Sequence, residues 1–157
     1  MFTRNGLGIT ALRSITLVLT ALAMSAALAH EFEQPNKINL SREQYLIVQQ
    51  LYMGWAWLGL VVVGATVTTL MLALTSRKEP RVFSGALIAF VGVAASLVVF
   101  AIFTYPVNQA THNWTMTPDN WEALRRDWEY SHATAAGLDF VAFVALVVTL
   151  VRVKGGR

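Results

Sequence analysis

The sequence contains no cysteine, which excludes disulfide bonds, thiolate metal ligands and a cysteine nucleophile. Charged residues are scarce as well: they make up 13% of the 157 residues, whereas 55% of the residues are hydrophobic. Because an ordinary soluble domain carries about 25% charged residues, this composition excludes that class. We expect residues 1–157 to form a single domain embedded in the lipid bilayer.

The hydrophobic residues gather in four runs, at 14–29, 54–75, 82–103 and 133–151. A helix that spans a bilayer needs roughly 17–25 such residues. The sequence therefore predicts an all-α fold, a four-transmembrane-helix antiparallel bundle. The expected spans are about 10–31, 52–76, 82–105 and 132–152, and the expected outer loops are about 32–41 and 106–117.

The first run has a second interpretation, which is a cleaved secretory signal. Arg13 precedes the run, and the segment 27–29 matches the A-x-A pattern of a cleavage site. We favour a retained helix, because the run continues into His30 and Glu31 without the polar turn that commonly follows a signal. Cleavage of the first run would also leave only three helices, an unusual number for a packed bundle.

Positively charged residues are more numerous on the side of the two termini than on the other side. The first side holds Arg4, Arg13, Arg77, Lys78, Arg81, Arg152, Lys154 and Arg157, and the second holds Lys37, Arg42, Arg125 and Arg126. Since positively charged loops are retained in the cytoplasm, we predict that both termini are cytoplasmic. The formal net charge of +3 then reflects this topology, and we expect no nucleic acid partner.

The second helix is predicted to be longer than a bilayer is thick. Ser41 and Gln44 form a capping-box pattern, so we expect this helix to run from Arg42 to about Ser76. At ~1.5 Å per residue it would measure ~50 Å, against a hydrocarbon core of ~30 Å. It should therefore extend beyond the membrane on the outer side.

The fourth helix is expected to extend beyond the membrane on the same side. Thr117 suits the N-cap and Pro118 suits the first helical position, where its missing N–H costs nothing. We therefore predict a helix from there to about Val153.

Small residues are frequent in the third span, where we expect close helix packing because packing must replace the hydrophobic effect in lipid. They are Gly85, Ala86, Ala89, Gly92, Ala94, Ala95 and Ser96. The tight turn at 77–81 predicts that the second and third helices are antiparallel neighbours. Such faces also leave open a homo-oligomer or an accessory role in a larger membrane assembly.

One face of the predicted fourth helix is aromatic and ionisable. At ~100° per residue, five residues fall within an arc of about 60°: Trp121, Arg125, Trp128, His132 and Asp139. One interpretation is an interfacial belt, since Trp favours the headgroup region and Arg pairs with nearby carboxylates. The other is a face that binds a substrate at the mouth of the bundle.

Asp139 is the deepest residue of this face, ~10 Å beyond His132 at ~1.5 Å per residue. An ionised side chain at that depth costs roughly 2.5–3.5 kcal/mol, so Asp139 must face protein or water. Either it is protonated and hydrogen-bonded across the bundle to Thr66 or Thr69, with a packing role only, or it belongs to a proton relay or a binding site.

Two pairs of residues have the i,i+3 spacing that places metal ligands on one helix face. They are His30 with Glu33 and Glu129 with His132, and all three histidines, His112 included, are predicted on the outer side. Zinc, iron or manganese accepts such nitrogen and oxygen ligands. The usual di-metal set needs further glutamates inside the spans, and the sequence has none there.

The third predicted loop opens with a proline and an asparagine. Pro106 should end or kink the third helix, and Asn108 can then bond the freed backbone groups. The functional alternative is that Asn108 and Trp114 line a pocket.

Pro106-Val-Asn108, followed by Trp121-x-x-Leu-Arg125-x-x-Trp128-x-x-x-His132 on a chain with four spans, resembles the anthrone-oxygenase-like family of small membrane proteins. The resemblance covers most of the chain. It implies a four-helix membrane fold, most of whose members are of unknown function.

The resemblance also implies an activity, which is the oxidation of anthrones and related phenols to quinones by molecular oxygen without an organic cofactor. Asn108, Trp128 and His132 are the matching positions. The sequence departs from the family at Asp127 and Ala135, where many members carry Arg.

Three hypotheses follow. The first is a membrane enzyme for lipophilic aromatic molecules, in which His132 is the general base, because an imidazole has an ordinary pKa of ~6.5. Asn108 would then stabilise developing negative charge, and the substrate would be bound by Trp128, Trp121, Arg125, Asp139, Trp114 and Tyr52. No cofactor is expected.

The second hypothesis is a structural or accessory membrane protein without catalysis. The third is a protein that binds a divalent metal through His30, Glu33, Glu129 and His132. A transporter fits less well, since four spans lack the paired broken helices of alternating-access carriers.

Overall fold

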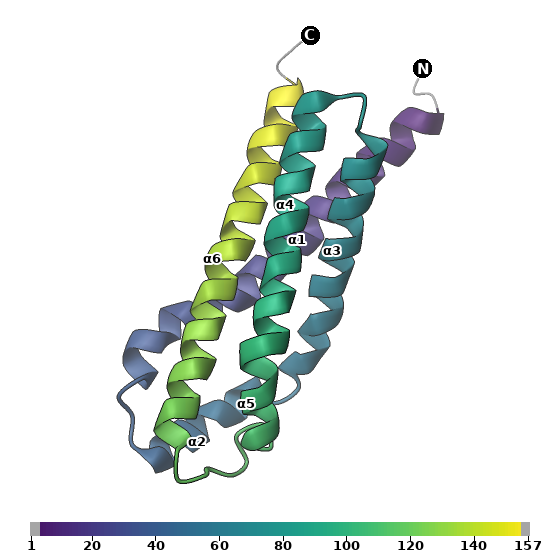
Figure 1. Ribbon diagram of the computed structural model, residues 1–157. Coiled ribbons are helices and arrows are strands. Elements are labelled where there is room, and N and C mark those ends of the chain that lie inside the picture. Colours follow the sequence, from purple (N-terminus) through teal and green to yellow (C-terminus); the bar gives the residue numbers. More distant parts are fainter. Residues whose placement is uncertain (1–3, 155–157) are drawn as a thin grey trace.

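The structure is a computed structural model that describes residues 4–154, and it contains helices and no strand within those residues (Figure 1). The helices are α1 (Arg4–Lys37), α2 (Arg42–Gln49), α3 (Leu58–Thr75), α4 (Pro80–Val99), α5 (Tyr105–Ala110) and α6 (Trp121–Lys154). Two 3₁₀ turns, Gln50–Tyr52 and Trp55–Trp57, lie between α2 and α3, and a π-helical segment, Phe100–Thr104, joins α4 to α5.

Four helical segments are long and apolar enough to cross a membrane, as the sequence predicts. They are Gly6–Lys37, Trp55–Thr75, Pro80–Ala110 and Trp121–Arg152. The chain is therefore a multi-pass integral membrane protein whose helices contact lipid. Because helices satisfy their own backbone hydrogen bonds, they are suited to this environment.

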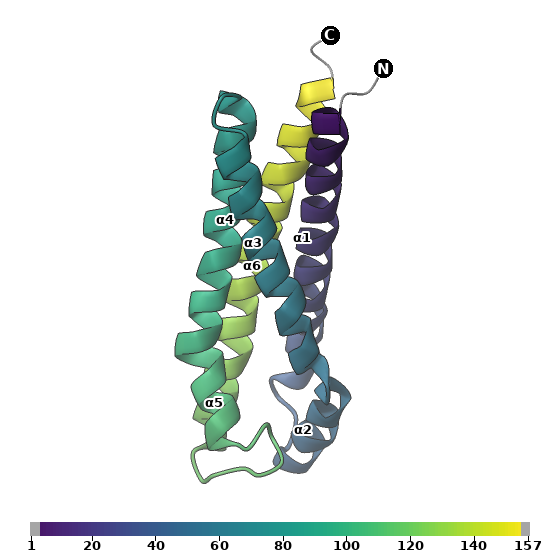
Figure 2. The ribbon, with the colours of Figure 1, turned by 90° about the vertical axis from the view of Figure 1, so that its right-hand side faces the viewer.

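The long helices α1, α3, α4 and α6 alternate in direction, so the start of α1 and the end of α6 lie at the same end of the bundle (Figures 1 and 2). We call this the terminal end of the bundle, and we call the opposite end, where α2 and α5 lie, the distal end. Each long helix packs against two others, with the most extensive contact between α4 and α6. Which side of the membrane each end faces stays a prediction.

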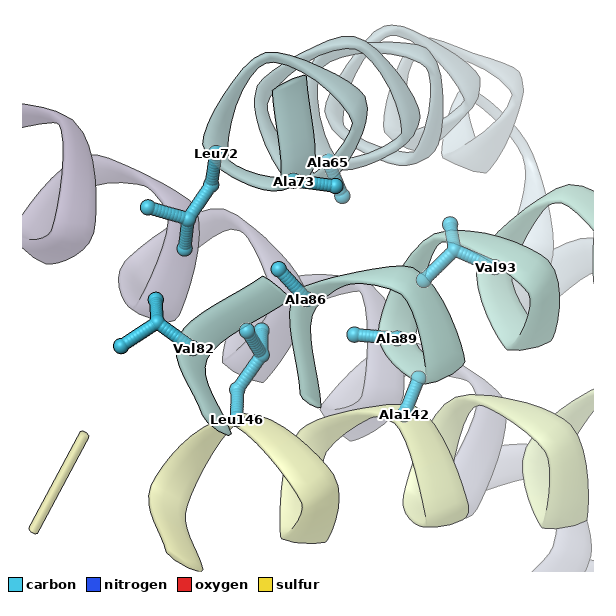
Figure 3. Packing of buried hydrophobic residues seen from close by; sticks show 9 residues of the cluster. All are labelled: Ala65, Leu72, Ala73, Val82, Ala86, Ala89, Val93, Ala142 and Leu146. Carbon is cyan, nitrogen blue, oxygen red and sulfur yellow. The ribbon is translucent and has the colours of Figure 1, made fainter. Parts of the chain in front are cut away.

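The core between α3, α4 and α6 is built mainly from small side chains. Its fully buried members are Ala65, Leu72, Ala73, Val82, Ala86, Ala89, Val93, Ala142 and Leu146 (Figure 3). Gly85 allows α6 to pack closely on α4, because a Cβ added there would lie 2.7 Å from the Cβ of Thr149. The prediction that small residues of the third span mark a helix interface is confirmed for Gly85, Ala86, Ala89, Gly92 and Ser96, which are all buried.

The prediction of one continuous second helix from Arg42 to Ser76 is wrong. Ser41 and Gln44 do form the capping box, but α2 ends at Gln49 and α3 begins only at Leu58. Between them Gly54 has φ +88°, a left-handed conformation that a residue with a Cβ adopts only at a cost. This turn folds α2 back across the distal end.

The boundaries of the other helices also differ from the predicted ones. The first helix continues to Lys37 with Pro35 in its last turn, so the loop predicted at 32–41 shrinks to 38–41. Thr117 and Pro118 do not cap the last helix, which begins at Trp121. Instead the carbonyl of Asn120 accepts the first hydrogen bonds of α6, from Ala123 and Leu124.

Pro106 does not end the third helix. The preceding segment widens to π-helix at Phe100–Thr104, and Pro106 then falls in the first turn of α5, where a missing N–H is tolerated. The helix therefore continues as α5 into the region that the sequence predicts to be a loop.

The contact at Gly85 predicts a stability effect. Gly85→Ala should destabilise the protein by about 1–3 kcal/mol, because α4 and α6 must separate to admit the methyl group. Gly137→Ala is the matched control: nothing lies within 4 Å of an added Cβ there. Exchanging a helical glycine for alanine at such a position should stabilise by up to ~1 kcal/mol. Thermal unfolding in detergent compares the two variants, and equal midpoints would contradict this packing.

Candidate functional site at the distal end

Two of the three histidines meet at the distal end inside a group of aromatic rings. We call His30, Tyr52, Trp55, Trp128 and His132 the histidine cluster. The centroids of the two imidazoles are 4.5 Å apart, and the Trp128 ring lies 4.0 Å from His132 and 5.1 Å from His30. Tyr52 and Trp55 cover His30 at 4.3 Å and 5.1 Å. Residues from α1, the two 3₁₀ turns and α6 thus form one packed group.

The hydrogen bonds of the two imidazoles differ. His132 Nδ1 lies 2.9 Å from the carbonyl oxygen of Trp128. A carbonyl can only accept, so Nδ1 carries the hydrogen and Nε2 holds the lone pair. His30 Nδ1 is buried and has no hydrogen-bond partner. The His132 ring, with the lone pair on Nε2, therefore lies next to a second, incompletely satisfied imidazole.

Asn108 positions the tryptophan of this cluster. Trp128 Nε1 donates a 2.9 Å hydrogen bond to Asn108 Oδ1, which ties α6 to α5. The expectation that Asn108 bonds backbone groups freed by Pro106 is therefore wrong. With its oxygen occupied by the indole, the Asn108 side chain has its amide N–H groups left to offer.

Beside the histidine cluster lies a buried ionic network formed by Lys37, Tyr45 and Glu129, whose exposed fractions are 2%, 0% and 1%. Lys37 Nζ is 3.4 Å from one oxygen of Glu129, and the Tyr45 hydroxyl donates a 2.7 Å hydrogen bond to the other. Burial, and then the Glu129 carboxylate, raise the pKa of the Tyr45 phenol above its ordinary value. Tyr45 therefore remains a donor to Glu129.

Lys37 also links this network to the histidine cluster. Its Nζ donates a 2.8 Å hydrogen bond to the Tyr52 hydroxyl and lies over the Trp128 ring at 5.1 Å. The Tyr52 hydroxyl in turn donates to Glu33, which is half-exposed and lies 3.7 Å from Lys37 Nζ. No motif in the sequence singles out Lys37, and only the folded chain brings its ammonium to Glu129.

Arg125, Trp121 and Trp114 form the outer layer of this region. Arg125 Nη1 donates a 2.8 Å hydrogen bond to the Leu40 carbonyl, and its guanidinium lies 4.6 Å from the Trp121 ring. Trp114 is buried with its ring edge-on to Tyr45 at 4.9 Å. These contacts tie the 38–41 turn to α6 and the loop after α5 to α2, and Arg125 binds a backbone carbonyl where the belt interpretation expected a carboxylate.

His112 and Asp139 lie apart from this region. His112 is exposed in the turn after α5, with φ +48°, so the three histidines do not converge. Asp139 is buried deeper in the bundle, and its Oδ1 has no hydrogen-bond partner, since the nearby Ser96 hydroxyl donates to the Val93 carbonyl. The expected partners are occupied otherwise: the hydroxyls of Thr66 and Thr69 donate to carbonyls of their own helix.

The four candidate metal ligands are not brought together as a set. His30 and His132 are neighbours, whereas Glu129 is engaged by Lys37 and Tyr45, and Glu33 is engaged by Tyr52. Within residues 4–154, no three histidine, aspartate or glutamate side chains gather as metal ligands would.

A groove of about 370 Å³ lies between α1 and α6. Two of its lining residues, Glu31 and Ala133, directly follow His30 and His132 in the sequence. We call it the histidine-side groove; it is lined by Leu28, Glu31, Ala133, Ala136, Gly137 and Phe140. Its volume is within the range of small-molecule sites, ~300–1,000 Å³. Glu31 is the one charged residue that lines this mainly apolar groove, and its Oε2 is buried without a hydrogen-bond partner.

Comparisons of this chain with protein-family models, with curated proteins and with solved structures find no match. The resemblance to the anthrone-oxygenase-like family therefore stays a prediction, carried by Asn108, Trp128 and His132. What the site itself defines is a packed aromatic and ionic centre at one end of a membrane bundle.

The buried ion pair yields the second prediction. Lys37→Met should lower the free energy of unfolding by about 3–5 kcal/mol, because it leaves the Glu129 charge buried without its partner. Lys37→Met combined with Glu129→Gln should recover most of this loss, since the charge is then gone and the amide oxygen still accepts from Tyr45.

Lys78→Met, at an exposed position, is the control and should change stability by no more than about 0.5 kcal/mol. Unfolding by denaturant in detergent micelles measures all three variants. A Lys37→Met variant as stable as Lys78→Met would show that the pair does not hold the distal end together.

Proposed function

We propose that this protein is a membrane enzyme that oxidises lipophilic aromatic molecules, phenols or quinols, with dioxygen as the oxidant. The observation that carries the proposal is the histidine-side groove, because it is mainly apolar, has the size of a small-molecule site and is lined by Glu31 and Ala133, the sequence neighbours of His30 and His132. A flat ring entering from the lipid would fill it without crossing water.

The role proposed for His132 is that of general base. Its Nε2 holds the lone pair and takes the proton of a phenolic hydroxyl or of an acidic C–H. A quinol then transfers two electrons and its second proton to dioxygen, and the proton held by His132 completes hydrogen peroxide, which leaves a quinone and a neutral imidazole. An anthrone loses the two hydrogens of its CH₂ group, one oxygen atom becomes the new carbonyl, and the other leaves as water.

The surrounding residues support this chemistry. Lys37 and the Asn108 amide N–H groups are the nearby donors for negative charge on an aromatic oxygen, and the orphaned Glu31 carboxylate offers an acceptor to a second hydroxyl. Trp128 provides a rigid wall held by its bond to Asn108. The substrate contacts expected of Trp121, Arg125 and Trp114 are not part of this proposal, because these side chains bind other parts of the chain.

The topology proposed with this function is an antiparallel bundle with cytoplasmic termini. At ~1.5 Å per residue, the 34 residues of α6 measure ~51 Å, and the hydrocarbon core is ~30 Å thick. The distal turns of α6 then stand beyond the core, which places the histidine cluster at the rim of the bilayer.

A structural role is the second candidate, and one observation favours it. The five rings of the histidine cluster pack against one another, as they would in an aromatic staple that closes the distal end. In that case His132→Ala would lower the unfolding temperature and change nothing else.

Enzymatic activity can be assayed with detergent-solubilised protein and either anthrone or a lipophilic hydroquinone. Dioxygen uptake and quinone absorbance measure the turnover. His132→Ala should reduce kcat by about 10²–10⁴-fold, the usual contribution of a general base. His112→Ala, which changes an exposed histidine, should leave kcat unchanged. Wild-type protein without turnover of either compound, or equal turnover by His132→Ala, would refute the assignment.

Filling the groove tests the substrate site separately. Gly137→Phe places a ring in the histidine-side groove without striking any atom near the backbone, so it should raise KM or abolish binding while the fold persists. Gly59→Phe adds the same ring at another open position, on α3, and should behave as wild type. Quenching of tryptophan fluorescence by added anthrone measures binding, and similar quenching in both variants would place the substrate elsewhere.

A further inference from the structure

A second and larger groove, of about 1140 Å³, lies between α4 and α6 toward the terminal end. We call it the terminal groove. Its apolar wall includes Ile88, Val141, Val144 and Val148, and its mouth includes Arg81 and Arg152. No residue of the ionic network or of the histidine cluster belongs to it, so the enzyme proposal leaves its purpose unexplained.

The charge at the mouth of this groove is positive. Glu79 also lines the mouth, but its carboxylate forms a 3.0 Å ion pair with Arg13 of α1. Within the described residues, neither Arg81 nor Arg152 takes part in an ion pair, and both are exposed. Two guanidinium groups therefore border the groove, and a guanidinium binds phosphate oxygens in a bidentate manner.

The length of the groove matches one leaflet of a bilayer. Its α6 wall runs over residues 140–152, which is ~18 Å at ~1.5 Å per residue. Half of a hydrocarbon core of ~30 Å is ~15 Å. The basic mouth is at the end of two membrane helices and the apolar wall runs from it toward the middle of the bundle, as an acyl chain runs from its headgroup.

We propose that the terminal groove binds an anionic phospholipid, with the phosphate between Arg81 and Arg152 and one acyl chain along α4 and α6. Basic pockets between membrane helices on the cytoplasmic side recognise such headgroups, and the terminal end is the one predicted to be cytoplasmic. This proposal does not depend on the proposed enzymatic function.

A second copy of the chain suits this surface less well. In a two-fold dimer the same patch faces itself, so the arginines of both copies would approach one another. An anionic lipid instead neutralises both arginines and covers the apolar wall that they border.

The test compares binding of phosphatidylglycerol and phosphatidylcholine by native mass spectrometry of detergent-solubilised protein, with each lipid titrated from mixed micelles. We expect wild-type protein to prefer phosphatidylglycerol by about tenfold or more, since each arginine near a phosphate contributes on the order of 1 kcal/mol. Arg81→Gln combined with Arg152→Gln should abolish the preference. Arg77→Gln, at an exposed position of the same turn and outside the groove, should keep it.

A second variant tests the acyl chain. Val148→Trp fills the apolar wall, leaves both arginines in place, and should weaken binding of either lipid. Equal binding of the two lipids, an unchanged preference in the double arginine variant, or full competition by inorganic phosphate would each overturn the proposal. A dimer that excludes lipid from the groove would overturn it as well.

Discussion

The distal end depends on a lysine and a glutamate that meet out of contact with solvent. Bringing two charges out of water is costly, and their attraction offsets the cost only when the geometry is good and the remaining atoms are hydrogen-bonded. Tyr45 and Tyr52 meet this condition, because one donates to Glu129 and the other accepts from Lys37. The pair therefore joins α1, α2 and α6 in one arrangement.

The position of the two imidazoles follows from this arrangement. His30 lies two helical turns before Lys37 on α1, and His132 lies one turn after Glu129 on α6, so each histidine shares a face with one partner of the ion pair. Fixing the ion pair sets the register of α1 against α6, which brings the rings to 4.5 Å. The ionic network thus positions the two imidazoles of the site.

The membrane fold could be predicted from the sequence, since the length of an apolar run decides whether a helix spans a bilayer. The aromatic face of α6 was also predictable, because the residues of one helix face are related by the helical period alone. The partners of that face could not be predicted: Lys37 and Tyr45 reach Glu129 only through the packing of segments distant in sequence. The break at Gly54 could not be predicted for another reason. Glycine recurs there every five residues, and Gly59 and Gly64 lie inside α3 whereas Gly54 does not.

The π-helical segment at Phe100–Thr104 has a consequence for how the distal end was assembled. A π-helical turn accommodates about one residue more than an α-helical turn, so it rotates everything after it by ~100° relative to an unbroken helix. Asn108 meets Trp128 because of that rotation, and without it the amide would be directed to another side of the bundle. The π-helical segment thus sets which side of the third long helix faces this centre, while α4 before it packs against α6 through Gly85 and Gly92.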